Sequence, residues 1–477
     1  MGCLAHLVNT KNPLYDLGSL VKKMIEKQLQ NILQLRKTYQ SELYIVGGTL
    51  RDLILGRQYS DFDFSVKGAS ILAKQYAHAT KSALVPLDTT PGRETFRVVI
   101  KKNLYFDFSE LQGNSIEVDL SRRDFSINAL AISLPDFIKG TEKYIDPHNG
   151  QKDILNKVIR VLPGSAFSKD PLRMLRAFRF MSILDFKIES STLKKIKTLH
   201  SKINRVSPER IRNELYILLS NKKASPSIQA MEGSGLLESI FPELYKNEKA
   251  HSCIKILSHV EKLLSDPKQV GGKPLPEIKK LLSEKPQLVR LGSMLYPLTQ
   301  KSSIKKNTNK KSNRKTITSK ILTKLRASNA DIDFVVAMIS CTHFVPSIHL
   351  TGTDSSASRI RIYQLIHLNE QGLIPGLFLY LANRSIMLKE KEWQADPSAM
   401  TVIEILNFYF RTYLPAKRKN PLLNGNDLQR ELKIKPNSII KTILYKVEES
   451  RVIGIINTRP EAIQLAKKII LEKKDVH

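Results

Sequence analysis

The N-terminal third of the chain alternates between short strand-like and helix-like patterns of apolar residues. Between residues 17 and 40 apolar side chains recur near the helical period, which predicts a helical leader. Residues 69–81 have helical spacing as well. Four other segments have the apolar runs or the strict alternation of strands: 43–46, 61–66, 96–100 and 105–108. This order predicts a small α/β unit over residues 41–135.

From Asp170 onward the helical period persists and only Gly and Pro interrupt it. The pattern predicts helices at 170–184, 190–201, 207–220, 360–390 and 400–413. The expected fold class is therefore an α/β head followed by all-α domains in a multi-domain chain. No internal repeat is visible.

Length and charge sharpen this picture. A chain of 477 residues with 42% hydrophobic residues is long enough for two to four domains. Its formal charge of +31 indicates a polyanionic partner, which from charge alone is RNA, DNA or an anionic membrane surface. Segment 301–326 has ten Lys or Arg and no Asp or Glu, which predicts a flexible basic loop.

Cysteine content and hydropathy narrow the class of protein. The three cysteines form no C-x-x-C pair, which argues against a disulfide framework or a zinc ribbon and suits a reducing compartment. No run approaches 18 uninterrupted apolar residues, and the first residues lack the apolar run of a signal peptide. We therefore expect a soluble, cytoplasmic protein with no membrane partner.

Candidate chemistry centres on a glycine turn and paired carboxylates. Gly47 and Gly48 end a predicted strand and open a helix, an arrangement that lets backbone N–H groups approach a phosphate. Asp61 and Asp63 alternate on a strand, so both side chains point to one face. Carboxylate oxygens completed by phosphate and water suit Mg²⁺, and Asp107 on a neighbouring strand is a candidate third carboxylate.

The alternative for such a pair is simple solvation, because an Asp-x-Asp on an exposed strand edge usually has no ligand. The glycine turn just upstream favours a metal site for a nucleotide instead. Phosphoryl transfer with two metal ions needs this assembly, since one ion activates the attacking hydroxyl and the other stabilises the leaving pyrophosphate.

These residues resemble the class II tRNA nucleotidyltransferase (CCA-adding) and bacterial poly(A) polymerase family. Five segments in the family's order carry the resemblance: 44–52 with 61–63, 122–130, 146–153, 169–177 and 206–215. The family has a polymerase-β-like nucleotidyltransferase head followed by helical neck, body and tail domains. The resemblance implies Mg²⁺ as cofactor, CTP and ATP as substrates, and a tRNA or another RNA 3′ end as partner.

The resemblance also implies roles for single residues. Asp61 and Asp63 would hold the metal, and Asp107 would draw the proton from the primer's 3′ hydroxyl. Asp170 and Arg173, three apart on a predicted helix, would read the edge of the incoming base and select C or A; their ordinary alternative is a surface salt bridge. The residues assigned to the nucleotide are Gly47, Gly48, Arg51, Arg122, Arg123, Asp124, Asn128, Asp170, Arg173, Arg176 and Arg179.

Two features depart from the commonest family pattern. Lys169 stands where the family usually has an acidic residue that helps orient the selecting pair, which weakens the expectation of strict fidelity. The connection from Asp107 to Arg122 is short, as in relatives that add only CC. The short connection also resembles a compact subtype to which no specificity is assigned, so addition of CC alone stays an alternative to addition of CCA.

The C-terminal half resembles the family less closely. Tyr296-Pro297 stand where some relatives have the metal-binding His-Asp pair, so we expect a degenerate domain without hydrolase activity and His251 and His259 as ordinary helix residues. Residues from 420 onward resemble the family's RNA-holding tail. The expected domains are a leader (1–40), head (41–160), neck (161–244), body with the basic loop (245–415) and tail (416–477).

The sequence thus predicts a template-independent nucleotidyltransferase that adds C and/or A to the tRNA 3′ end. One alternative is a poly(A) polymerase that uses ATP only and accepts many RNA 3′ ends. A second is a non-catalytic RNA-binding protein with a dead transferase head.

Overall fold

The computed structural model describes residues 19–37, 42–57, 61–101, 104–164, 166–265, 276–300, 313–348, 356–388, 396–433 and 438–474. It divides the chain into two compact units. The first comprises residues 1–206 with 233–239, and the second comprises residues 207–232 with 240–477.

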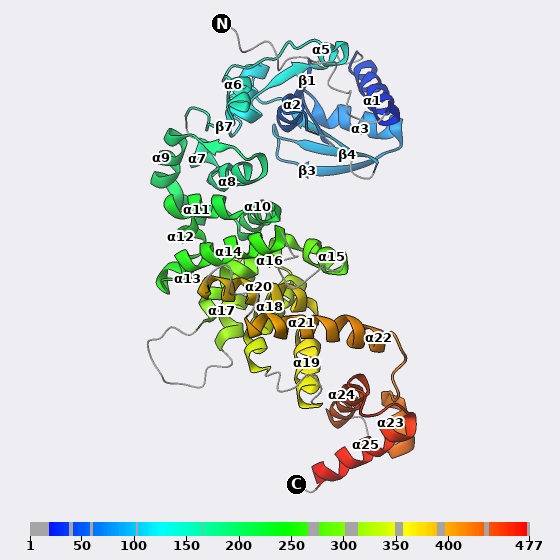
Figure 1. Ribbon diagram of the computed structural model, residues 1–477. Helices are drawn as coiled ribbons and strands as arrows, with labels where there is room; N and C mark the ends of the chain where they lie inside the picture. Colours follow the sequence, from blue (N-terminus) through cyan, green and yellow to red (C-terminus); the bar gives the residue numbers. More distant parts are fainter. Residues whose placement is uncertain are drawn as a thin grey trace. The chain divides into compact units, whose positions relative to one another are not determined.

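A six-stranded mixed sheet organises the first unit (Figure 1). Its strands are β1 (Leu43–Val46), β2 (Asp61–Val66), β3 (Ala83–Asp88), β4 (Thr95–Lys101), β5 (Leu104–Glu110) and β6 (Ala131–Ser133). The spatial order is β3-β4-β5-β2-β1-β6, with β2 and β5 parallel and every other pair antiparallel. The predicted α/β head is therefore confirmed.

Aromatic side chains fill one face of this sheet. Phe62, Phe64, Phe106 and Phe108 are fully buried, and Tyr76 stacks 5.8 Å from the Phe106 ring. Because strand side chains alternate between faces, burying these phenylalanines places the intervening aspartates on the opposite face. The hydrophobic pattern thus fixes the position of the carboxylates before any polar contact forms.

Helices cover the aromatic face and continue the first unit. α1 (Ser19–Lys37), which confirms the helical leader, packs on α3 (Ala69–Thr80), and α3 packs on β4 and β5. The remaining elements are α2 (Gly48–Ile54), α4 (Ile116–Leu120), η1 (Ser126–Asn128), α5 (Leu134–Lys139), α6 (Gly150–Leu155), β7 (Val158–Ile159), α7 (Ala166–Lys169), α8 (Leu172–Leu184), β8 (Lys187–Ile188), α9 (Ser190–Leu199), η2 (His200–Arg205) and α12 (Leu236–Ile240).

The sequence pattern did not predict the two edge strands of the sheet. β3 is mostly exposed and contains Pro86, as edge strands often do, so it has no alternation of apolar residues. β6 has only three residues, too few to show a period.

The second unit is helical throughout its described residues, as predicted. α14 (Ala250–Ser265), α16 (Pro286–Leu295), α18 (Asn329–Phe344) and α20 (Leu373–Met387) pack together. Buried apolar residues occupy several sides of α20, which explains why its period is weak in the sequence. The other elements are α10 (Pro208–Ser220), α11 (Ser225–Gly233), α13 (Pro242–Lys246), α15 (Pro276–Glu284), η4 (Tyr296–Thr299), α17 (Asn313–Lys324), η5 (Val345–Ser347), α19 (Ser356–Asn369), η6 (Glu370–Gly372), α21 (Pro397–Phe408), the π-helix η8 (Tyr409–Tyr413), α22 (Leu414–Lys417), α23 (Gly425–Leu432), α24 (Ser438–Val452) and α25 (Arg459–Lys474).

The expectation of a basic loop over 301–326 is wrong for its second half. Residues 313–324 form α17, while residues 301–312 lie outside the described part. Ile321, Leu322 and Leu325 are buried at helical spacing, together with Thr318. A single apolar stripe on a strongly basic segment is enough to anchor the helix, although the average composition conceals it.

The predicted helix over 360–390 is two helices. α19 ends at Asn369, and α20 begins at Leu373 after the single turn of η6. A Cβ at Gly372 would lie 2.2 Å from the backbone N of Met338, so only glycine allows α18 to approach this closely. The break is therefore set by packing against α18.

The residues in place of a His-Asp pair belong to the packed interior. Tyr296 and Pro297 open η4, and the Tyr296 ring lies 5.4 Å from that of His343. His251 and His259 both lie on α14, and His259 Nδ1 is 3.0 Å from Ser385 Oγ, as expected for ordinary helix residues.

No helix in the described ranges has the length and apolar character needed to cross a bilayer.

Candidate active site

Three aspartates meet on the face of the sheet opposite the phenylalanines. In the parallel β2–β5 pair Asp63 lies in register with Asp107, and Asp61 is two residues before Asp63 on the same face. Strand alternation predicted this grouping for Asp61 and Asp63, and the register adds Asp107. Like charges this close repel one another unless protons, cations or arginines compensate them.

This crowding changes the pKa of Asp63. Burial, with the charges of Asp107 and Asp61 adding to it, raises the pKa of Asp63 to about 6, against the opposing effect of Arg123 and Arg51. A nearby cation would therefore stabilise the ionised form of Asp63 more than that of an ordinary aspartate.

Arg97 is a site residue that the sequence analysis missed. Its Nε and Nη2 donate to Asp107 Oδ1 and Oδ2 at 2.8 and 2.7 Å, a two-point ion pair across the β4–β5 register. The guanidinium also lies 4.7 Å from the centre of the Tyr105 ring. Both oxygens of Asp107 are thus engaged, so acceptance of a proton would require this fork to open. The sequence did contain a signal for this residue, because Arg97 interrupts the apolar run of the predicted strand 96–100.

The glycine turn brings the backbone close to these carboxylates. Gly47 has φ +70°, in the left-handed region, and a Cβ there would lie 2.9 Å from Arg123 Nη1 and 3.6 Å from Asp63 Oδ2. Gly48 opens α2 without a side-chain cap. Glycine at residue 47 is therefore required both by conformation and by the guanidinium packed against it.

Thr49 connects this turn to the aspartates, a role that the sequence pattern did not suggest. Its Oγ1 donates to the carbonyl of Asp61 at 3.0 Å and accepts from the N–H of Asp63 at 3.1 Å. The side chain is buried. One hydroxyl thus fixes α2 to the part of β2 that carries both carboxylates.

A chain of charged contacts runs from α2 to α8. Arg51 donates to Asn128 Oδ1 at 2.7 Å, Asn128 Nδ2 donates to Asp124 Oδ1 at 3.0 Å, and Arg176 Nε donates to Asp124 Oδ2 at 2.8 Å. Arg51 also forms a two-point pair with Asp52. Burial would raise the pKa of Asp124, but Arg176 and the hydrogen bonds outweigh it and lower the pKa. Asp124 is therefore an ionised anchor for the surrounding arginines.

The Arg122–Asp124 segment lies between α4 and η1. Arg123 Nη2 pairs with Asp119 Oδ2 at 3.1 Å. Its buried Nε has no hydrogen-bond partner within the described ranges. An orphaned guanidinium N–H beside the glycine turn fits a bound anion such as phosphate. Arg122 is exposed.

The structure differs in one respect from the prediction that Asp170 and Arg173 lie on one helix. α8 begins at Leu172, so Asp170 precedes the helix and accepts from the N–H of Leu172 at 3.3 Å. The helix could not extend back through Pro171 because proline disfavours helical conformation in the residue before it. Arg173 is on α8 and donates to the carbonyls of Arg123 and Arg122 at 3.0 and 2.9 Å. Lys169 is exposed at the end of α7.

Three guanidinium groups lie close to the ring of Phe180, which the sequence analysis did not predict as a site residue. Arg179, Arg51 and Arg176 lie 4.4, 5.3 and 5.6 Å from the centre of its ring. The aromatic face spaces like charges that would otherwise repel one another. These three arginines together with Arg123 are called the arginine wall below, and the charges of Arg51 and Arg123 act on Asp63.

The donor chemistry fits a Mg²⁺ ion shared with a substrate. Among the described residues no group of three or more His, Cys, Asp or Glu side chains is arranged to hold a metal by itself. Asp107 turns to Arg97, which leaves Asp61 and Asp63 as the candidate protein ligands. Mg²⁺ is commonly bound by one or two carboxylates and completed by phosphate and water oxygens.

Two family models match parts of the chain. Residues 43–160 match the family described as "Poly A polymerase head domain", and residues 185–247 match "Probable RNA and SrmB- binding site of polymerase A". The chain is 30% identical over 448 residues to a CCA-adding enzyme of Ligilactobacillus salivarius, covering 91% of this chain and 94% of that enzyme. It is 26% identical over 447 residues to an A-adding tRNA nucleotidyltransferase of Deinococcus radiodurans, covering 88% and 93%.

Another relative matches over a shorter region. A CC-adding tRNA nucleotidyltransferase of Geobacter sulfurreducens is 36% identical over 243 residues, so the match spans 50% of this chain and 54% of that relative. A solved CCA-adding enzyme in complex with ATP has the same fold, with a TM-score of 0.63 at 21% identity over 95% of this chain and 96% of that one.

Replacing Thr49 by Val should destabilise the protein by about 1–3 kcal/mol, because the part-buried N–H of Asp63 and carbonyl of Asp61 lose the hydroxyl of Thr49. The measurement is the free energy of unfolding in denaturant. Thr49→Ser keeps the hydroxyl and serves as the matched control. Equal stabilities for the Val and Ser variants would show that the hydroxyl does not connect α2 to β2.

Asp63 should make the metal-free protein less stable as pH rises. Its folded pKa of about 6 lies above the ordinary value of 3.8, so folding favours the protonated form. The stability this confers is complete below about pH 4 and is lost as pH rises through 6, on the order of 3 kcal/mol in total. Asp63→Asn cannot ionise, so the unfolding free energy of wild type minus variant should fall over this range in EDTA. Parallel pH profiles would contradict the assignment.

Proposed function

Since the chain belongs to the tRNA nucleotidyltransferase and poly(A) polymerase family, we propose that it adds C and/or A from CTP and ATP to the 3′ end of tRNA. The observation that carries the proposal is the placement of Asp61, Asp63 and Asp107 beside the glycine turn and the arginine wall. The relatives named above add CC, CCA or A. The choice of nucleotides that this chain adds is therefore part of the proposal.

The carboxylates and the turn supply the reacting centre. Asp61 and Asp63 would hold Mg²⁺, which when bound neutralises the triphosphate and activates the 3′ hydroxyl, with a second ion at the leaving pyrophosphate. Gly47 and Gly48 leave room for phosphate oxygens to approach the backbone. Asp107, held by Arg97, would orient or accept the proton of the attacking hydroxyl once the ion pair opens.

The arginine wall would bind the rest of the nucleotide. Arg123, with its unpartnered Nε, is placed for phosphate, and Arg51 and Arg179 add positive charge around Phe180. Asp124 and Asn128 are fixed by Arg176 and Arg51, which positions them for the ribose hydroxyls. Arg122 is exposed and available to the triphosphate or to RNA.

Base selection would fall to Asp170 and Arg173 at the start of α8. Two of the five N–H groups of Arg173 donate to the carbonyls of Arg122 and Arg123. These bonds orient the guanidinium and leave its other N–H groups as further donors. The Asp170 carboxylate would accept from the exocyclic amino group that C and A share. This pair would exclude U and G, which lack that amino group at the equivalent edge.

Two further assignments belong to the same proposal, and one alternative to it stays open. Head (41–160), neck (161–244), body (245–415) and tail (416–477) would be successive functional regions after the leader. A cytoplasmic location follows from the tRNA substrate. The poly(A) alternative keeps a specific support in the family description matched by residues 43–160.

Activity should depend on Asp61. A tRNA transcript ending at the discriminator base, incubated with each labelled nucleoside triphosphate in turn, should incorporate CMP or AMP. Asp61→Asn should lower incorporation more than about a hundredfold by weakening the metal site, without weakening tRNA binding. Long A tracts would favour the poly(A) polymerase, and no incorporation by the wild type would favour a binding protein. Wild-type rates in Asp61→Asn would remove the metal assignment.

Selectivity should depend on Arg173. Arg173→Ala is expected to lower kcat/KM for CTP at least tenfold and to reduce the preference for CTP over UTP, because the base edge loses a directed donor. Arg173→Lys retains the charge but not the fork, so it should recover binding better than selectivity. An unchanged CTP-to-UTP ratio in both variants would show that another residue reads the base.

A further inference from the structure

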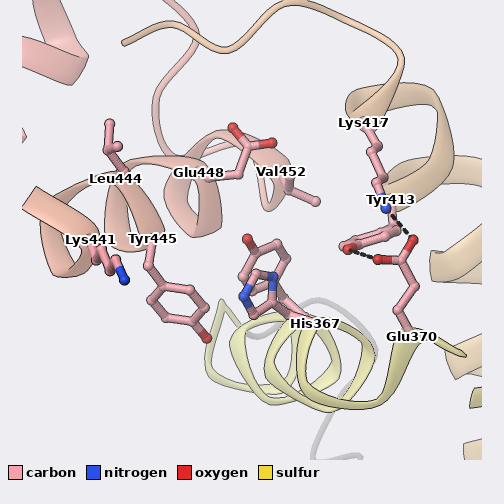
Figure 2. Close-up of a pocket in the computed structure, with 10 residues that line it drawn as sticks. His367, Glu370, Tyr413, Lys417, Lys441, Leu444, Tyr445, Glu448 and Val452 are labelled. Carbon is pink, nitrogen blue, oxygen red and sulfur yellow. Dashed lines mark hydrogen bonds and ion pairs between the residues drawn. The ribbon is translucent and has the colours of Figure 1, made fainter. Parts of the chain in front are cut away.

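An aromatic cavity lies in the second unit, among residues far in sequence from the carboxylate site. It encloses about 480 Å³ and is lined from α19, η6, η8, α22 and α24 (Figure 2). None of the residues assigned above to metal, nucleotide or base lines it. The proposed transfer reaction therefore leaves this cavity without a role.

Four aromatic rings from three helical elements form its walls. Tyr363 and His367 on α19 are stacked, with centroids 5.7 Å apart and planes at 16°. Tyr445 of α24 meets His367 edge-on at 4.9 Å, and Tyr413 of η8 lies 6.0 Å from Tyr363. In Figure 2 Tyr445 and Tyr413 approach His367 from opposite sides. Such walls offer both faces and edges to a flat aromatic guest.

Charged groups at the cavity are mostly committed to one another. Glu370 accepts from Tyr413 Oη at 3.3 Å and pairs with Lys417, and Glu448 pairs with Arg451. Within the described residues the His367 ring and the Lys441 ammonium make no hydrogen bond. His367 and Lys441 are both exposed. The His367 imidazole is thus free to hydrogen-bond a ligand among the aromatic walls, and the Lys441 ammonium is an unpaired cation beside them.

This combination selects against most anions and in favour of a neutral heteroaromatic ring. A phosphate inside the cavity would meet the carboxylates of Glu370 and Glu448. A nucleobase carries no such charge, stacks on tyrosine, and can donate its amino hydrogens to carboxylate oxygens. The phosphates flanking the base would lie near the exposed ammonium groups of Lys417 and Lys441.

We propose that this cavity binds one unstacked nucleobase of the tRNA, away from the 3′ end that reacts. The proposal rests on the proposed function for the identity of the RNA. The base would add a stacking contact to the salt-dependent attraction expected of a chain with a formal charge of +31. It would contribute to holding the RNA and not to the chemical step.

The test compares tRNA binding by the His367→Ala/Tyr445→Ala double variant with that of Leu368→Ala. Leu368 is the next residue on α19, is 65% exposed and does not line the cavity, so it is a matched control. The double variant should raise the Kd for a transcript lacking CCA about tenfold or more, with kcat at saturating tRNA unchanged. Leu368→Ala should bind like wild type.

Salt dependence separates stacking from charge. Loss of the two rings should leave the slope of log Kd against log salt unchanged, whereas Lys441→Ala should reduce it by about one. A double variant that unfolds like wild type and binds tRNA with the wild-type Kd would overturn the proposal.

Photocrosslinking identifies the source of the base. Labelled tRNA should crosslink to the peptide containing Tyr445 in wild type, and labelled ATP should not. Labelling by ATP alone would overturn the assignment to RNA. If wild type binds tRNA and crosslinks at Tyr445 but transfers no nucleotide, the proposed function fails and the base site stands.

Discussion

Carboxylate crowding on the β2–β5 pair is the constraint on which the site depends. Parallel pairing sets Asp63 directly opposite Asp107, and burial of the phenylalanines on either side of each aspartate forces both aspartates onto the other face. A pKa of about 6 for Asp63 is the physical consequence, because burial and neighbouring negative charge both oppose its ionisation. The proposed cation and triphosphate would offset this repulsion.

The surrounding contacts divide into those that hold the carboxylates and those that face them with positive charge. Thr49 fixes the Asp61–Asp63 backbone, and Arg97 occupies Asp107. On the other side Asp124 anchors Arg176, while Phe180 spaces three guanidinium groups. A nucleotide would enter a site in which opposite charges are already placed, so little reorganisation is needed on binding.

The sequence predicted those parts of the molecule that follow from periodicity and spacing. The head, the leader helix and the shared face of Asp61 and Asp63 follow from alternation and helical repeats. Arg97 and Thr49 were missed because their roles depend on register between strands and on a contact between α2 and β2. The apolar stripe of α17 and the break at Gly372 were missed because each depends on packing against other elements. Asp170 was placed on α8 although Pro171 follows it.

The most direct test of the central claim is binding of Mn²⁺, a paramagnetic substitute for Mg²⁺, followed by electron paramagnetic resonance with a non-reactive CTP analogue present. The account predicts tight binding that requires the nucleotide and is lost in Asp61→Asn and in Asp63→Asn, since both carboxylates are needed alongside phosphate oxygens. Equal binding of Mn²⁺ by wild type and both variants would contradict it.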